Sequence, residues 1–197
     1  MVALDSASTD ALPPGFLRDV RAFLDDAFAG AFTDDDWAHA RGGMHVWLVG
    51  SRGLISHGSL VERTLICSNH TMRVGYVEAR SNQFTEALHD DRAVNPSAGA
   101  LLRWRPLYQL GVLSTGAHSF YESLGWERWS GPTFVNGPRG HERTPEDDDG
   151  IMILRTPRSL SLTLWEISCA TGAWVPSGRP GTAPQRLGTC ILWRSQP

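Results

Sequence analysis

A carboxylate closes an alternating segment that reads MRVGYVEA over residues 72–79. Met72, Val74 and Tyr76 fall on one side of an extended chain, because successive side chains of a strand point to opposite faces. Glu78 would stand at the strand's end. There it could act as a general base, if a substrate proton came within hydrogen-bond reach directly or through one water molecule. The residues alone leave the alternative open of a carboxylate satisfied at a sheet edge.

Two acidic clusters, residues 34–36 and 146–149, could bind a polycation. At an effective dielectric constant of about 20, a charge pair about 4 Å apart contributes roughly 4 kcal/mol before desolvation and screening. Several carboxylates around a cleft would therefore select a polyamine-like ligand and speed its arrival. The alternative is solvated charge, with the first cluster in the first turn of a helix and the second in a polar loop.

Tyr121 follows the apolar run YQLGVLST (108–115), in a short segment of helical pattern. A packed aromatic is the ordinary interpretation, and a proton donor to a leaving thiolate is the alternative. The sequence contains no HExxH or Cys-His pairing, no nucleophile elbow and no Walker or Rossmann glycine pattern. We therefore expect no metal site.

Length and composition indicate one globular domain: the chain has 197 residues, of which 41% are hydrophobic and 20% charged. The net charge of −3 argues against nucleic-acid binding. No apolar run reaches the ~18 residues of a membrane span, and no secretory signal pattern is present. The three cysteines are well separated, which favours a reducing, cytoplasmic compartment.

Hydrophobic periodicity predicts the elements that position these residues. A first helix is expected over 14–29, and a short second helix begins at Asp34 with Thr33 as its N-cap. A third is expected over 116–126, where Gly125 would end the helix. Together with the strands, they predict an α+β fold with a central mixed, mostly antiparallel sheet flanked by helices. The predicted strands are 44–50, 54–68, 70–78, 108–115, 132–137, 150–156 and 159–169.

One domain is expected over residues 14–169, preceded by a flexible N-terminus at 1–13. Residues 80–107 form an atypical segment, in which Pro96 would break a helix. Residues 170–197 are rich in Gly, Pro, Ser and Arg, and we expect a poorly ordered tail there.

Six segments follow one another in a recognisable order: AFAGAFTDDDWAHARGGMH (27–45), RVGYVEA (73–79), YQLGVLSTG (108–116), YESLGW (121–126), GPTFV (131–135) and RTPEDDDG (143–150). This ordered set resembles the aminoglycoside 2′-N-acetyltransferases, a branch of the GNAT acetyltransferase superfamily. The resemblance covers residues 16–169 in the family's order and approximate spacing. It implies a GNAT fold and an enzyme of antibiotic resistance, which transfers an acetyl group from acetyl-CoA to the 2′-amine of an aminoglycoside.

The resemblance assigns a role to each candidate on the substrate side. Asp36 and Trp37 would line the sugar pocket. Asp148 would contact the antibiotic's amines, and Ser114 would be a weaker substrate contact. Glu78 would take the ammonium proton, through water, because only the neutral amine can attack a thioester.

On the acetyl-CoA side, Tyr121 would protonate the departing thiolate. Backbone groups of Ala79 and Arg80 would bind the pantetheine arm like an added strand and polarise the thioester carbonyl. Members of the family tend to be homodimers, so a homodimer is also expected.

The chain departs from the family pattern in three places. Ala31 stands where the family has Asp. Residues 80–107 lack the Arg/Gln-x-x-Gly-x-Gly/Ala motif, whose backbone N–H groups bind the pyrophosphate. The C-terminus reads CATGAWVPSG (169–178) instead of Cys-Asp-Trp-Arg-x-Gly-Asp-x-Trp. One hypothesis is that 80–107 and 170–197 are frame-shifted, which sequencing the gene would test. The alternative function is a catalytically impaired GNAT-like domain that binds polycationic aminoglycosides without turnover.

Overall fold

The computed structural model describes residues 3–51, 53–67, 70–82, 107–129, 131–137, 140–159 and 190–192. The chain divides into two compact units. The single domain over 14–169 stays a prediction. The first draws on Met1–Glu62 and Gly75–Leu107, and the second on Arg63–Val74 and Tyr108–Gln196. Each unit is described by itself below.

The two helices that the sequence predicts for the first unit are confirmed. Helix α1 spans Pro14–Ala27, with Pro at its first position, where the missing N–H costs nothing. Its apolar stripe is buried in a cluster with Phe32, and Leu54 and Ala79 pack against this cluster. The buried residues of the helix are Val20, Phe23 and Leu24.

Helix α2 (Asp34–Ala40) begins at the predicted N-cap. The Thr33 hydroxyl accepts a hydrogen bond from the Asp36 backbone N–H at 3.1 Å. The Asp36 carboxylate in turn accepts from the Thr33 N–H at 2.9 Å. This reciprocal capping box satisfies two N–H groups that the helix itself leaves without acceptors.

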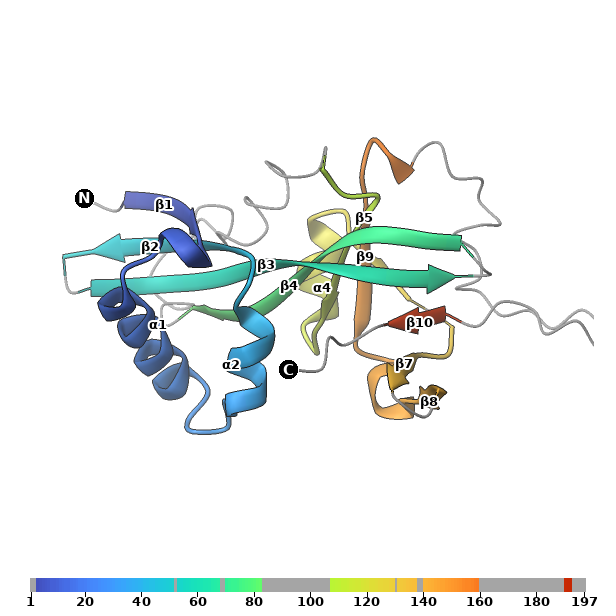
Figure 1. Ribbon diagram of the computed structural model, residues 1–197. Coiled ribbons are helices and arrows are strands. Elements are labelled where there is room, and N and C mark those ends of the chain that lie inside the picture. Colours follow the sequence, from blue (N-terminus) through green and yellow to red (C-terminus); the bar gives the residue numbers. More distant parts are fainter. Residues whose placement is uncertain are drawn as a thin grey trace, which may run out of the picture. The chain divides into compact units, whose positions relative to one another are not determined.

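The strands of the first unit are β1 (Ala3–Ser8), β2 (Met44–Gly50) and parts of β3 (Gly53–Cys67) and β4 (His70–Asn82). Strand β1 lies within the stretch predicted as a flexible N-terminus, and it pairs antiparallel with β2. The short helix η1 (Thr9–Ala11) follows it. Helix α1 lies along one side of β2 and β3 (Figure 1), where the Phe16 and Trp47 rings meet at 4.7 Å.

The β2–β3 hairpin contains a register shift between Leu48 and Val49. Next to it, Gly43 approaches β3 so closely that a Cβ would lie 2.2 Å from the Leu60 carbonyl oxygen. A side chain at position 43 would therefore force the two segments apart.

The second unit contains the C-terminal elements and the remaining parts of β3 and β4. Its strand order is β6-β9-β5-β4-β3-β10-β7-β8, in which β10 is parallel to β7. The pairs β5–β9, β7–β8 and β3–β10 are antiparallel, so the predicted mixed, mostly antiparallel sheet is confirmed. Its elements are β5 (Leu110–Ser114), α4 (His118–Ser123), β6 (Glu127–Arg128), β7 (Phe134–Gly137), β8 (Gly140–Arg143), η3 (Pro145–Asp147), β9 (Ile151–Arg155) and β10 (Cys190–Leu192).

Three of these strands lie where the sequence predicts none. Strand β6 follows the predicted helix 116–126, and β8 lies between the predicted strands 132–137 and 150–156. Strand β10 lies in the stretch expected to be a poorly ordered tail. Helix α4 ends at Ser123 with Leu124 as its C-cap. The predicted terminating residue, Gly125, follows with a φ of +85°, which glycine adopts without strain. Residues 160–169 of the strand predicted at 159–169, and residues 83–106 of the atypical segment, lie outside the described residues. No described helix is long and apolar enough to cross a membrane.

Candidate functional site

The backbone of β4 changes conformation directly after Glu78. Ala79 has a φ of +46°, in the left-handed region that residues with a Cβ seldom adopt. The carbonyl oxygen of Glu78 lies 3.3 Å from the Ser59 hydroxyl, and that of Ala79 lies 3.1 Å from Nδ1 of His57. The half-buried Glu78 is therefore followed by a peptide whose orientation the side chains of β3 fix.

Two residues with separate predicted roles meet at one hydrophobic cluster. Ala79 of β4 and Trp37 of α2 both pack against the buried residues of α1 and Phe32. The predicted sugar-pocket aromatic and the predicted acetyl-CoA residue are thus anchored on the same core. Glu78 directly precedes Ala79, so its backbone adjoins that core.

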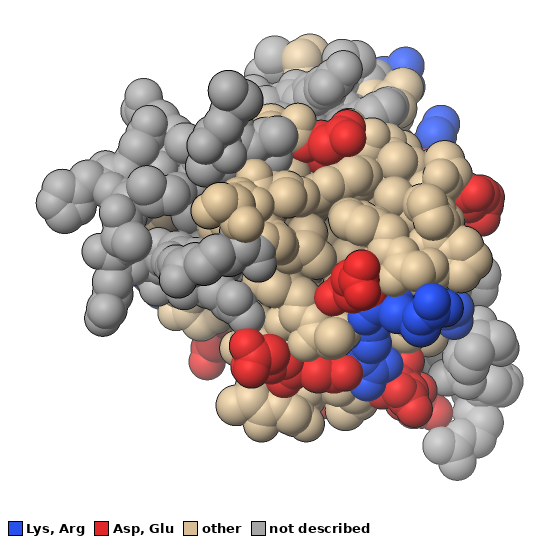
Figure 2. Space-filling model, turned by 90° about the vertical axis from the view of Figure 1, so that its left-hand side faces the viewer, with Lys and Arg blue, Asp and Glu red and all other residues tan. Residues whose placement is uncertain are grey.

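The carboxylates at the start of α2 are partly used inside the protein. Asp34 forms an ion pair with Arg21 at 2.8 Å, and Asp36 caps its own helix. Asp35 is exposed. Acidic side chains also lie next to basic ones on the face seen in Figure 2, which therefore does not present an unbroken anionic surface.

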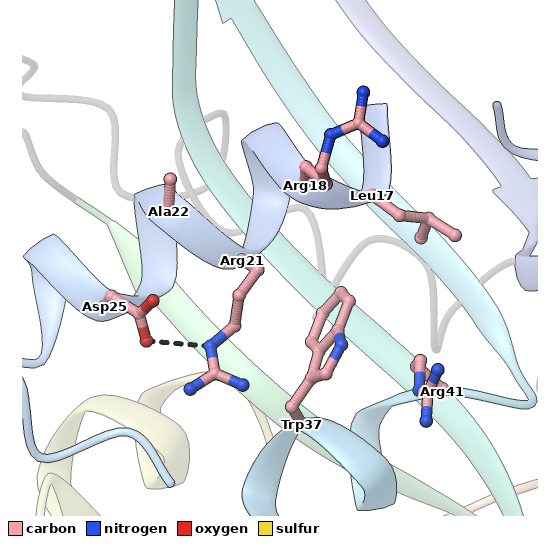
Figure 3. A pocket seen from close by; sticks show the side chains of 7 residues that line it. All are labelled: Leu17, Arg18, Arg21, Ala22, Asp25, Trp37 and Arg41. Atoms are coloured by element: carbon pink, nitrogen blue, oxygen red, sulfur yellow. Dashed lines mark hydrogen bonds and ion pairs between the residues drawn. The ribbon is translucent and has the colours of Figure 1, made fainter. Parts of the chain in front are cut away.

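A hollow of about 350 Å³ lies between α1 and the end of α2 (Figure 3). Three guanidinium groups and a single carboxylate line it, and Asp25 accepts a hydrogen bond from Arg21 Nε at 2.8 Å. This charge balance disfavours a polycation, so the hollow does not suit an aminoglycoside. Its residues are Leu17, Arg18, Arg21, Ala22, Asp25, Trp37 and Arg41.

In the second unit, Ser114 ends β5 opposite Ile151 of β9. The segment that follows is tied to residues 149–150. The Thr115 N–H donates to the Gly150 carbonyl at 2.8 Å, and the His118 Nε2 lies 2.7 Å from the Asp149 carbonyl oxygen. Ser114, which directly precedes this segment, is exposed.

Tyr121 lies in α4 with only 1% of its surface exposed. Its ring makes edge-to-face contacts with Phe120 at 5.2 Å and with Trp126 at 5.6 Å, a favoured geometry for aromatic pairs. The ring orientation is thereby fixed. A role as proton donor would require the thiolate to reach a hydroxyl that the folded chain covers.

Asp148 follows η3, and both of its carboxylate oxygens bind neighbouring residues. Oδ1 accepts from the backbone N–H and the hydroxyl of Thr133, both at 2.9 Å, and from Nη1 of Arg143 at 2.7 Å. Oδ2 pairs with Nη2 of Arg143. The Arg143 guanidinium, with the Thr133 donors, lowers the pKa of Asp148 to about 2. A substrate amine would have to displace Arg143 to bind this carboxylate.

The structure groups the predicted site residues by unit. Those on α2 and β4 fall in the first unit, and Ser114, Tyr121 and Asp148 fall in the second. The site-residue predictions do not include His45 and His57, whose ring nitrogens lie 3.0 Å apart. The signal available in the sequence was one histidine inside each of the predicted strands 44–50 and 54–68.

No protein-family model matches the chain. The chain is 40% identical over 159 residues to an aminoglycoside 2′-N-acetyltransferase of Mycolicibacterium fortuitum, covering 76% of this chain and 78% of that protein. Its fold is similar to that of an acyl-CoA N-acyltransferase from Pseudomonas aeruginosa, with a TM-score of 0.55 and 13% identity over 78% of this chain and 99% of that one. ElaA of Escherichia coli is similar at a TM-score of 0.52 and 14% identity, over 78% and 99% of the two chains.

Proposed function

Because the chain belongs to the aminoglycoside 2′-N-acetyltransferase family, we propose that it transfers an acetyl group from acetyl-CoA to the 2′-amine of an aminoglycoside. The observation that carries this proposal is the turn of the β4 backbone directly after Glu78. At this turn, the Glu78 carboxylate is followed directly by the backbone amides of Ala79 and Arg80. The proposal includes a cytoplasmic location and a homodimer.

The reaction begins with an ammonium group, which cannot attack a thioester. Glu78 takes a proton from it, directly or through water, and leaves a neutral amine. The amine nitrogen then bonds to the acetyl carbon, the carbon–sulfur bond breaks, and the nitrogen releases a second proton to solvent water. Tyr121 donates its phenolic proton to the departing thiolate and is reprotonated from solvent.

The backbone after Glu78 fits a thioester. The amide N–H groups of Ala79 and Arg80 would bind the acetyl-CoA arm and stabilise the negative charge that develops on the carbonyl oxygen during attack. Acetyl-CoA supplies the activated acetyl group in this scheme. The residues that would hold its pyrophosphate fall in 80–107, most of which lies outside the described part of the chain.

On the substrate side we propose Asp36 and Trp37 of α2, with Ser114 and Asp148. The Thr33 groups that Asp36 binds are neutral, so Asp36 keeps a charge that attracts a polycation over a distance set by ionic strength. Arg143 offsets the charge of Asp148, so a substrate amine would have to take the place of Arg143 there. Each unit has an exposed carboxylate next to these residues, Asp35 beside Asp36 in the first and Asp149 beside Asp148 in the second.

The test is release of CoA thiol from acetyl-CoA in the presence of tobramycin, which carries a 2′-amine. An aminoglycoside with a 2′-hydroxyl in its place is the matched control. Thiol release with the first and none with the second is the expected result. Binding of both by calorimetry with no thiol release would instead show a domain that captures aminoglycosides without turnover.

A further inference from the structure

A pair of buried histidines links the first turn after β1 to the turn of β4. His45 of β2 and His57 of β3 are both 0% exposed. In the β2–β3 register, Trp47 lies opposite His57 and Ser59 opposite His45, so both imidazoles lie on one face of the hairpin. His45 Nδ1 lies 3.0 Å from His57 Nε2.

The other ring nitrogen of each histidine also has a hydrogen-bond partner. His57 Nδ1 lies 3.1 Å from the carbonyl oxygen of Ala79, and His45 Nε2 lies 2.9 Å from the hydroxyl of Thr9. That hydroxyl also accepts from the Gly42 N–H at 2.9 Å. The four groups therefore form one continuous hydrogen-bonded chain from Thr9 to Ala79.

The hydrogen bonds between Thr9 and Ala79 all run in one direction, because the Ala79 carbonyl oxygen at the end can only accept a hydrogen bond. A carbonyl oxygen has no hydrogen, so His57 must carry its own on Nδ1 and accept at Nε2. His45 must then also carry its hydrogen on Nδ1, so its Nε2 can only accept from the Thr9 hydroxyl at 2.9 Å. The other acceptor within reach of that hydroxyl, the Gly43 carbonyl oxygen, lies farther away at 3.2 Å. Burial supports neutral rings, since it lowers the pKa of His45 to about 4 and that of His57 to about 3.

The end of the chain holds an unusual peptide. In a regular strand, successive carbonyls point to opposite sides, yet the Glu78 and Ala79 carbonyls both accept from side chains on the same face of β3. Ser59 and His57 are these donors. In a trans peptide the N–H points opposite to the C=O, so the N–H groups of Ala79 and Arg80 are turned away from β3.

We propose that His57, backed by His45 and Thr9, is a positioning residue for acetyl transfer. By fixing the Ala79 carbonyl, it aims the amide N–H groups after Glu78 at the thioester of acetyl-CoA. A neutral imidazole in the Nδ1–H form suits this task, because it offers one donor to the carbonyl and brings no charge next to the general base. The proposal rests on the proposed acetyl transfer and adds to it the residue that orients the amides.

Two matched variants separate positioning from mere packing. In His57→Asn, the amide nitrogen can take the place of Nδ1 and still donate to Ala79. In His57→Gln, the amide lies one carbon further out, where Nε2 was, and reaches His45 instead. We expect both variants to fold with similar melting temperatures. We expect acetyl-CoA affinity and kcat to fall roughly 10–100-fold in His57→Gln, with His57→Asn close to wild type.

Nitrogen-15 histidine spectra of the wild-type protein provide a readout that does not depend on activity. Two histidines should show the Nδ1–H form, and the signal missing from His57→Asn identifies His57. An Nε2–H form at His57 would overturn the proposal, because the Ala79 carbonyl would then lack its donor.

The outcomes also separate the two proposals. If wild type turns over and the Asn and Gln variants lose activity equally, or only in proportion to their stability, the assignment of His57 is wrong and acetyl transfer stands. If wild type binds acetyl-CoA without turnover, titration of the two variants with acetyl-CoA still decides the role of His57. If wild type does not bind acetyl-CoA, both proposals are wrong.

Discussion

The Nδ1 atom of His57 lies 3.1 Å from the carbonyl oxygen of Ala79, the residue directly after the proposed general base. A non-glycine residue at a φ of +46° costs on the order of 1 kcal/mol, and it persists because its surroundings determine it. Here these surroundings are the His57 hydrogen bond and the packing of Ala79 on the α1 cluster. Both are supplied by the core of the first unit.

The buried histidines predict loss of stability in mild acid. Their pKa values of about 4 and about 3 in the folded protein lie below the ordinary 6.5, so the unfolded chain binds more protons once the pH falls below that value. Stability is therefore complete above about pH 6.5 and falls below it. Between pH 6.5 and 5, each histidine should lower the free energy of unfolding by on the order of 2 kcal/mol. Urea unfolding at a series of pH values measures this slope, and His57→Asn should make it shallower. An unchanged slope would contradict the neutral pair.

Replacement of Glu78 by Gln tests the general base. The variant should lose roughly 10²–10⁴-fold in kcat with little change in the KM for either substrate, because only proton removal is affected. The deficit should shrink as the pH rises, since more of the amine is then neutral in solution. Initial rates of thiol release between pH 6 and 9 give this profile. Glu62→Gln, at an exposed position of β3, is the control and should keep the wild-type rate.

Local patterns allowed the helices of the first unit to be predicted, but not the histidine pair. The capping residues and apolar spacing of α1 and α2 act within a few residues, so the sequence alone reveals them. The pairing of Gly50 with Gly53, continued without interruption, would set His45 opposite Gly58 and put the two histidines on different faces. The register shift at Leu48 and Val49 moves them onto one face. No local signal in the sequence marks that bulge.

The same limit applies to Asp148. The sequence shows an acidic run, but it does not show that Arg143 turns back through η3 to pair with it. Nor does composition reveal β10, whose pairing with β3 and β7 joins residues far apart in the chain. The partners of β10 are distant in the chain. Arg143 lies only five residues before Asp148, but whether the two side chains meet depends on the turn that η3 makes between them.

Asp148→Asn should destabilise the protein. The pair with Arg143 is partly exposed, so we expect a loss of about 1 kcal/mol in the free energy of unfolding after allowing for solvent screening. Since the pKa of Asp148 is lowered to about 2, its contribution is complete above the ordinary value of 3.8 and disappears as the pH falls through about 2. Denaturant titrations at pH 7 and in acid measure both effects.

Asp149→Asn is the matched control for that variant, because it removes the neighbouring exposed charge and leaves the Arg143 pair in place. Its free energy of unfolding should stay close to wild type. A rise in the aminoglycoside KM shared by both variants would report the acidic field. A larger rise in Asp148→Asn alone would report a direct contact with the substrate, and no rise in either would contradict the substrate role.

Tyr121→Phe keeps the aromatic contacts with Phe120 and Trp126 and removes only the hydroxyl. If Tyr121 protonates the leaving thiolate, kcat with acetyl-CoA should fall by roughly 10²-fold or more. An acetyl thioester of an acidic aromatic thiol needs no proton to leave, so with this donor the variant should approach the wild-type rate. Steady-state rates with both donors measure the difference. An equal loss with both donors would show that the hydroxyl acts on packing or binding, and full activity with acetyl-CoA at every pH would show that it does not act as the acid.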